Sequence, residues 1–94
     1  MSLLVVHHRV RDFDAWKPVF DEHESSRREH GAKHHWVYRT VDDPNDVVVA
    51  VEFGSESQAR EFVQDPSLRD AMERAGVEGE PQIQFRELVE TLDY

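Results

Sequence analysis

The sequence predicts a small α+β domain of ferredoxin-like order, β-α-β-β-α-β, with a four-stranded antiparallel sheet that carries its helices on one face. Segments in which apolar residues recur at every second position alternate with segments of helical apolar spacing. Capping residues and glycines separate these segments. The chain of 94 residues has no repeat or linker, so we expect a single domain over residues 1–94. A domain of this size buries about 65% of its unfolded surface, which makes its core modest.

Residues 3–10 are expected to form the first strand, because apolar side chains occupy both alternating faces. One face carries Leu4, Val6, His8 and Val10. The other face carries Leu3, Val5, His7 and Arg9. Since neither face is wholly polar, we expect both sides of this strand to be covered.

The first helix is expected to follow this strand directly and to run to about residue 30. Asp12 or Asp14 is a suitable N-cap, and Gly31 is a typical C-terminal stop. Pro18 comes early enough that its missing N–H costs less than it would in mid-helix. One apolar stripe of this helix carries Phe13, Trp16, Phe20 and His23.

A hairpin is expected next. Residues 32–40 read as a strand with Trp36 and Tyr38 on one face and His35, Val37 and Arg39 on the other. Residues 42–45 (Asp-Asp-Pro-Asn) form the expected turn. Residues 46–53 are rich in valine, which is typical of a strand in the middle of a sheet.

Two short helices and a last strand complete the expected order. Ser55 and Gln58 have the spacing of a capping box, and Asp65 followed by Pro66 marks a second helix start. Inward-facing residues of these helices are expected to be Ala59, Phe62, Val63, Leu68, Met72 and Ala75. Gly76 ends the second helix, residues 77–81 are expected to be a loop, and residues 83–89 to be a strand with Ile83, Phe85, Glu87 and Val89 on one face.

The composition excludes several kinds of partner. Twenty acidic and eleven basic residues give a formal net charge of -9, which repels nucleic acid and anionic membrane surfaces. No apolar run approaches the roughly 20 residues of a membrane span. The chain has no cysteine, which agrees with a cytoplasmic location.

The candidate site lies where the first strand meets the first helix. His8 is on the strand face with Val6 and Val10, and His23 is on the helix stripe with Trp16 and Phe20. The two imidazoles are therefore expected to share one cavity, where they would handle protons as catalytic residues. The alternative is that each imidazole only satisfies a hydrogen bond at the edge of the core.

Four further residues are candidates for contact with a small hydrophobic or aromatic ligand. Arg27, one helical turn after His23, would hold an anionic group, unless it is a solvated residue paired with an acid. The flat apolar walls of such a site would be Trp16, Phe20 and Tyr38, together with Trp36. The alternative is that these aromatic residues are ordinary core residues.

A metal site is a competing hypothesis, because His8, His23 and one of His34 or His35 would supply three imidazoles. The sequence has no H-x-H pair, and neighbouring histidines on a strand point to opposite faces. It also has no glycine-rich phosphate loop. We therefore expect neither a metal nor a cofactor.

The sheet face away from the helices is expected to carry apolar residues such as Leu3 and Val5. A patch of this kind indicates association, and packing two such faces together gives a homodimer.

The chain resembles the dimeric α+β barrel superfamily, which includes the antibiotic-biosynthesis monooxygenase-like proteins. The resemblance covers nearly the whole domain. It lies in the element order and in the motifs His8-x-Val10-x-Asp12-Phe13-x-x-Trp16, Phe20-x-x-His23, Asp42-Asp43-Pro44-Asn45 and Asp65-Pro66-x-Leu68-Arg69-x-Ala71-Met72, which runs into Ala75-Gly76-Val77.

The resemblance implies a homodimer with one pocket per subunit. Members of the superfamily oxygenate polyketide quinones without a cofactor, degrade haem, isomerise small molecules or only bind ligands, so the fold alone does not fix the reaction. Haem-degrading members use a histidine of the second helical segment, and this chain has no histidine after His35. Quinone monooxygenases use pocket asparagine, tryptophan, tyrosine and arginine side chains, and Trp16, Tyr38 and Arg27 are of these types.

The function expected from the sequence is therefore that of a small-molecule pocket protein. It is a cofactor-independent monooxygenase or an isomerase/cyclase-like enzyme acting on an aromatic or polyketide-like substrate. The alternative is a non-catalytic ligand-binding or structural homodimer.

Overall fold

The computed structural model of the protein describes residues 2–94, and Met1 lies outside the described residues. Eight elements follow one another along the chain. They are β1 (Ser2–Val10), α1 (Phe13–Glu22), α2 (Glu24–Glu29), β2 (Ala32–Thr40), β3 (Asp43–Phe53), α3 (Glu56–Gln64), α4 (Pro66–Arg74) and β4 (Val77–Glu87). None of the helices in residues 2–94 combines the length and the apolar character needed to cross a membrane.

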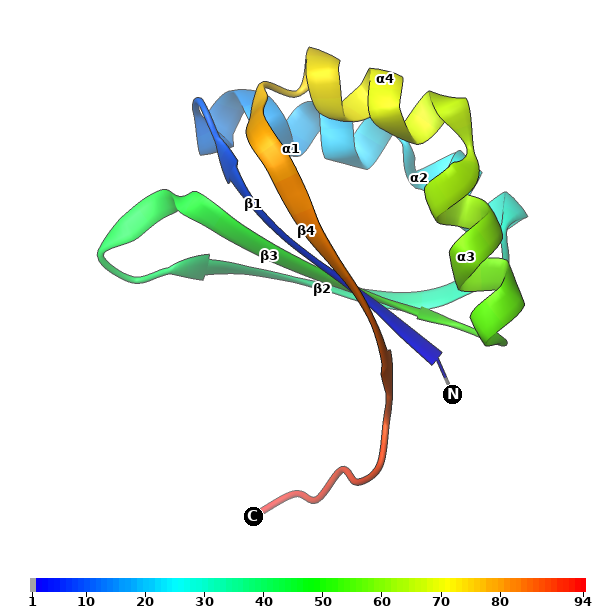
Figure 1. Cartoon of the computed structure of the whole chain (residues 1–94). Coiled ribbons are helices and arrows are strands. Elements are labelled where there is room, and N and C mark those ends of the chain that lie inside the picture. The colour runs from blue at the N-terminus through cyan, green and yellow to red at the C-terminus, as the bar shows by residue number, and fades with distance from the viewer. Residues whose placement is uncertain (1) are drawn as a thin grey trace.

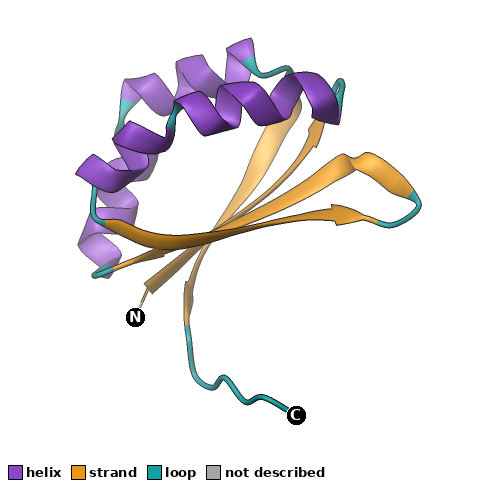
Figure 2. Cartoon of the chain, turned by 180° about the vertical axis from the view of Figure 1, so that it is seen from behind, coloured by secondary structure: helices purple, strands orange, loops and turns teal. Residues whose placement is uncertain are grey.

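The four strands form one sheet in the order β2-β3-β1-β4, and each neighbouring pair is antiparallel. All four helices lie on the same side of this sheet, and the opposite face carries no element (Figure 1). The view from behind shows the same two layers, with the C-terminal tail leading away from the sheet (Figure 2). The predicted ferredoxin-like α+β architecture is confirmed, with the valine-rich β3 inside the sheet.

The core lies between the helices and the inner face of the sheet. On this face Leu4 of β1 is opposite Val51 on β3 and Phe85 on β4. Val6 is likewise opposite Val49 on β3, two residue pairs further along. The alternation of apolar residues along β1 therefore places every second side chain in the core, as the sequence predicted.

Side chains that accept hydrogen bonds from backbone N–H groups fix the starts of three helices. Asp12 Oδ1 accepts from the Asp14 N–H at 3.1 Å, so Asp12 caps α1. Ser55 Oγ accepts from Gln58 N–H at 3.2 Å, and Asp65 Oδ1 accepts from Ser67 N–H at 2.9 Å. These bonds satisfy N–H groups that have no partner within the helix.

The first helix is interrupted at His23, where one continuous helix was expected. The backbone of His23 has ψ 6°, and its N–H is shared between the carbonyls of Val19 at 3.3 Å and Phe20 at 3.2 Å. The shared bond ends α1 with a tighter turn, and α2 begins at Glu24. Pro18 lies inside α1 rather than in its first turn. Arg27, the buried residue of α2, lies one helical turn after His23, so the spacing of inward-facing residues continues across the break and could not reveal it.

The hairpin turn is shorter than expected and lies earlier. Thr40 already pairs with Asp43, so the turn falls at residues 41–42 and Pro44 belongs to β3. The β2–β3 register shifts between Arg39 and Thr40. A proline is tolerated next to such an irregularity, where its missing N–H leaves no ladder bond unmade.

The last strand begins before its expected start. Residues 77–81 belong to β4 instead of a loop, and Val89 lies beyond the end of β4, almost fully exposed. The β1–β4 register shifts between His7 and Arg9, opposite the segment that holds Gly79 with φ 71° and Pro81. β4 is an edge strand, where a bulge and a proline are both permitted.

Candidate functional site

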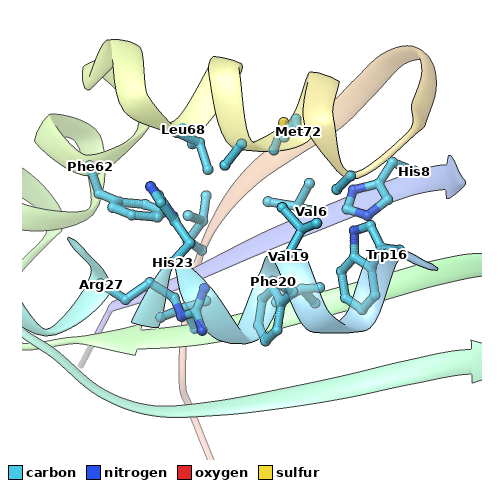
Figure 3. Close-up of a pocket in the computed structure, with 15 residues that line it drawn as sticks. Val6, His8, Trp16, Val19, Phe20, His23, Arg27, Phe62, Leu68 and Met72 are labelled. Carbon is cyan, nitrogen blue, oxygen red and sulfur yellow. The ribbon is translucent and has the colours of Figure 1, made fainter. Parts of the chain in front are cut away.

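A narrow apolar cavity lies between the helical layer and the inner face of the sheet (Figure 3). Its volume is about 60 Å³, and fifteen residues of β1, β3 and the four helices line it. Among these fifteen, the only polar or charged side chains are His8, His23 and Arg27. Ligand pockets usually measure about 300–1,000 Å³. A ring-sized ligand therefore requires the side chains between α1 and α4 to move apart.

His8 projects into this cavity from an irregular point of β1. It lies at the shift in register between β1 and β4, a kind of feature that redirects side chains near functional sites. Only 6% of His8 is exposed, and neither Nδ1 nor Nε2 has a hydrogen-bond partner among the described residues. An unpaired buried polar atom costs about 1–3 kcal/mol, so this imidazole is not explained as a satisfied core residue.

The surroundings of His8 determine its protonation. Burial and, to a smaller extent, the neighbouring His7 lower the pKa of His8 to about 4, and Asp46 opposes the shift. His8 is therefore neutral near pH 7, with one nitrogen able to accept a hydrogen bond and the other able to donate. The Trp16 ring lies beside it, with 5.7 Å between the ring centroids.

His23 enters the cavity from the junction between α1 and α2. Its Nε2 lies 3.2 Å from the Ser67 hydroxyl of α4, so this contact links the two sides of the helical layer. Burial lowers the pKa of His23, and the positive charge of Arg27 lowers it further. His23 is partly exposed, in contrast to His8.

Arg27 is the most unusual of the three polar residues. Only 4% of it is exposed, and its guanidinium carbon lies 3.8 Å from the centroid of the Phe20 ring. Its Nε has no hydrogen-bond partner among the described residues. Burial lowers the pKa of Arg27, but arginine stays protonated in proteins. The cavity thus has a buried positive charge in its wall.

The cavity has an aromatic wall and two separate polar regions. Trp16 and Phe20 are stacked, with ring centroids 4.9 Å apart and an angle of 21° between the planes. Figure 3 shows His8 next to Trp16 at one end and His23 with Arg27 at the other. The sequence prediction that His8 and His23 line one cavity agrees with this arrangement. The two imidazoles would, however, contact different atoms of a ligand.

Tyr38 and Trp36 are not part of this cavity. They project from the open face of the sheet, where Tyr38 pairs with Val48 and Trp36 with Ala50, and they are 57% and 44% exposed. The sequence placed both on one face of β2 but could not show which face the helices cover. Contact of Tyr38 with a ligand in this cavity is therefore ruled out by its position.

Among the remaining histidines, His30 packs against the same Phe62 ring as His23, with centroid distances of 5.5 Å and 5.9 Å. His35 packs edge-on against Phe20 at 5.2 Å, whereas His34 is on the open face, 3.7 Å from Glu52. No group of three His, Cys, Asp or Glu residues in residues 2–94 has the geometry to hold a metal ion. The combination of His8, His23 and His34 or His35 considered from the sequence is thus not assembled.

Sequence reasoning missed one polar contact and assigned other cavity residues only to the core. Ser67 was not singled out, although it follows the Asp65-Pro66 helix start and meets His23. Leu68 and Met72 were expected to face inward, and they line the cavity. Their spacing of four residues gave their direction but not the empty space beside them.

Solved structures share this fold over nearly their whole length. SnoaB from Streptomyces nogalater, a cofactor-independent oxygenase, has a TM-score of 0.80 and 15% identity, covering 99% of this chain and 97% of that one. An antibiotic biosynthesis monooxygenase has a TM-score of 0.74 and 14% identity, covering 96% and 100%. Rv0793 from Mycobacterium tuberculosis has a TM-score of 0.69 and 13% identity, covering 99% and 100%.

The chain therefore has the fold of the antibiotic biosynthesis monooxygenase-like proteins, as the resemblance in its sequence predicted. No protein-family model matches the sequence, and no curated protein matches it. TM-scores of 0.69–0.80 establish the fold, whereas identities of 13–15% leave the reaction to be argued from the site.

Proposed function

We propose that the cavity between the helices and the sheet binds a small hydrophobic or aromatic molecule. The observation that carries this proposal is His8, whose two buried nitrogen atoms face an apolar space without a partner among the described residues. A ligand with a hydroxyl or carbonyl group would supply the missing hydrogen bond. Trp16 and Phe20 form the apolar wall that such a molecule would contact.

The chemistry we propose is proton transfer without a cofactor, by a monooxygenase or an isomerase/cyclase-like enzyme. In both reactions a base first removes a proton from the substrate. The resulting anion then gives electrons to dioxygen or takes the proton back at another atom. SnoaB, which shares the fold, is a cofactor-independent oxygenase, and this likeness supports the first alternative.

His8 is the residue we assign to proton removal, because it is neutral near pH 7 and has a free nitrogen. A pKa of about 4 also makes it a weak base. It can therefore act only on a substrate whose proton is already acidic, such as a phenol or a C–H group between a ring and a carbonyl. An aromatic or polyketide-like substrate meets this requirement.

The second polar region serves for binding. His23 would anchor a polar group of the ligand, and its bond to Ser67 would open as α1 and α4 separate to admit a ring. Arg27 would lie beside the same end of the ligand. His23 and Arg27 therefore position the ligand, while His8 contacts the reacting atom.

We also propose that the protein is a cytoplasmic homodimer of single-domain subunits. The open face of the sheet carries Trp36 and Tyr38, together with half-buried Leu3 and Val5. Two copies packed through this face would bury these residues, and no nucleic acid or membrane partner is needed. If the cavity performs no reaction, the same dimer would serve as a ligand-binding or structural protein.

Exchange of acidic protons in D2O tests the proposed chemistry. We use 2-indanone, whose CH2 groups lie between a ring and a carbonyl, and follow the loss of their proton NMR signal. The protein should accelerate this exchange, and His8→Ala should lower the protein-dependent rate by about 100-fold or more. His7→Ala is the control, because His7 lies on the opposite face of the same strand.

The outcomes separate the two functions. Binding of 2-indanone that moves the His8 resonances without faster exchange would support the non-catalytic alternative. An equal loss of exchange in both histidine variants would contradict the role of His8. Neither binding nor exchange would overturn the proposed function.

A further inference from the structure

The buried arginine of the cavity lacks the partner that such a residue normally has. None of the ion pairs within residues 2–94 includes Arg27, although only 4% of this residue is exposed. Contact with the Phe20 ring occupies the face of the guanidinium. Its N–H donors lie in the plane and are not satisfied by that contact. Buried charges are ordinarily paired, so an anion bound next to Arg27 would stabilise this position.

The two acids that most affect Arg27 are already engaged elsewhere. Glu24 and Asp21 are the carboxylates whose charge acts on the Arg27 guanidinium. Glu24 Oε2, however, lies 3.3 Å from Arg28 Nε, and Asp21 Oδ1 lies 2.7 Å from Lys17 Nζ. These pairs are between neighbours on the surface of the helices, and they leave the inward side of Arg27 without a negative charge.

Other basic groups surround the same point. Burial lowers the pKa values of His23 and His35, and in both cases the Arg27 charge is the next cause. On its outer side Arg27 also lines a second cavity together with Arg28, Lys33 and His35, where Glu24 is the only acid among the lining residues. In a chain with a net charge of -9, Arg27, Arg28 and Lys33 thus place three positive charges around the outer cavity, and Arg27 is shared with the apolar one. This local excess favours an anionic ligand.

We propose that the ligand of the cavity is a small aromatic carboxylate whose carboxylate group is held by Arg27. This inference rests on the proposed function and specifies its substrate class. The planar guanidinium matches a carboxylate with two parallel N–H···O bonds, and the ring of the ligand would lie along Trp16 and Phe20 toward His8. A hydroxyl or carbonyl group at the far end of the ligand would then meet His8.

Benzoate and benzamide form a matched pair of probes for this inference. Both are planar and of nearly equal size, but only benzoate is charged. Isothermal titration calorimetry at low ionic strength should give benzoate a dissociation constant at least about ten-fold lower than that of benzamide. This comparison uses the unaltered protein, so it holds even if a variant does not fold.

Variants then locate the charge that is responsible. In Arg27→Met the preference for benzoate over benzamide should fall to within about two-fold. Arg27→Lys should keep part of the preference, because it retains the charge but not the planar fork. Arg28→Met removes the same charge from the adjacent, exposed position, and we expect it to change benzoate affinity by less than about three-fold.

Each result decides between the two proposals. If both probes bind equally and shift the His8 ring resonances, the carboxylate inference is wrong, but the proposed ligand site in this cavity is retained. If benzoate is preferred to the same degree in a folded Arg27→Met protein, its anion site lies elsewhere and the inference is overturned. If neither probe binds, the inference and the proposed function both fail.

Discussion

The two faces of the sheet are built from alternate residues of the same strands, but they end in opposite states. On the covered face Leu4 is fully buried by the helices. Its neighbour Leu3, on the open face, is only half-buried, and Trp36 on the same face is 44% exposed. One chain thus completes only one side of its sheet. The difference indicates that the covered face is the stable core, and it agrees with the proposal that a second copy packs on the open face.

The polar groups of the two faces differ in the same way. On the open face His7 Nε2 lies 2.7 Å from Asp46 Oδ1, and the Thr40 hydroxyl donates to Asp46 Oδ2 at 2.8 Å. On the covered face His8 has no partner among the described residues. Two adjacent histidines therefore have different tasks. The satisfied one links the central strands β1 and β3, and the unsatisfied one is available to a ligand.

The largest effect should come from truncating the core. Phe53 is fully buried, and Phe53→Ala should lower the free energy of unfolding by about 3–5 kcal/mol. Trp36→Ala, on the open face, should cost less than about 1 kcal/mol in dilute protein because its surface is already partly in water. Urea denaturation measures both. Equal losses would mean that the two faces do not differ as described.

The next largest effect concerns pH and His8. Its pKa is about 4 in the folded chain and near 6.5 in the unfolded chain, so the unfolded state binds the proton first as the pH falls. Stability should therefore decrease between pH 6.5 and 4, by up to about 3 kcal/mol from this residue. His23 and His35, whose pKa values are also lowered, act in the same direction.

His8→Phe isolates this contribution, because phenylalanine keeps a ring in the core but does not titrate. The variant should lose the part of the pH dependence between pH 6.5 and 4 that comes from His8, about 3 kcal/mol, and keep the part that comes from His23 and His35. Urea denaturation across this range is the measurement. A variant with the wild-type slope would show that His8 is solvated in solution.

A somewhat smaller effect is expected for association. Val5→Asp places a carboxylate in the centre of the open face, and we expect it to weaken dimerisation by about 100-fold, or about 2.7 kcal/mol. Since dimerisation stabilises the folded chain, its melting temperature should fall as well. Sedimentation at several protein concentrations measures the change. A wild-type chain that stays monomeric when concentrated would contradict the proposed dimer.

The sequence was sufficient for the parts of the fold that have a regular pattern. β2 has the predicted bounds of residues 32–40, and the helix caps at Ser55 and Asp65 lie where the spacing placed them. Five of the six predicted site residues line the cavity, because alternation on β1 and helical spacing on α1 fix the direction of their side chains. These are His8, Trp16, Phe20, His23 and Arg27.

What the sequence did not reveal depends on contacts between distant elements. Which face of β2 the helices cover depends on how β2 pairs with β3. Tyr38 is opposite Val48 on the open face, so it was wrongly placed in the cavity. The break at His23 and the bulge opposite His8 are backbone irregularities without a composition signal strong enough to read. The distance between the His8 and His23 imidazoles depends on how α1 packs over the sheet. The spacing of residues in the sequence does not predict this packing.

The central claim is that the ligand site lies on the covered face, and imidazole NMR during titration with 2-indanone tests it most directly. Four histidines serve as probes, two in the cavity and two on the open face. The account predicts that the ring signals of His8 and His23 shift with one common dissociation constant, while those of His7 and His34 stay nearly fixed. Shifts of His7 and His34 without shifts of His8 and His23 would place the ligand on the open face and contradict the claim.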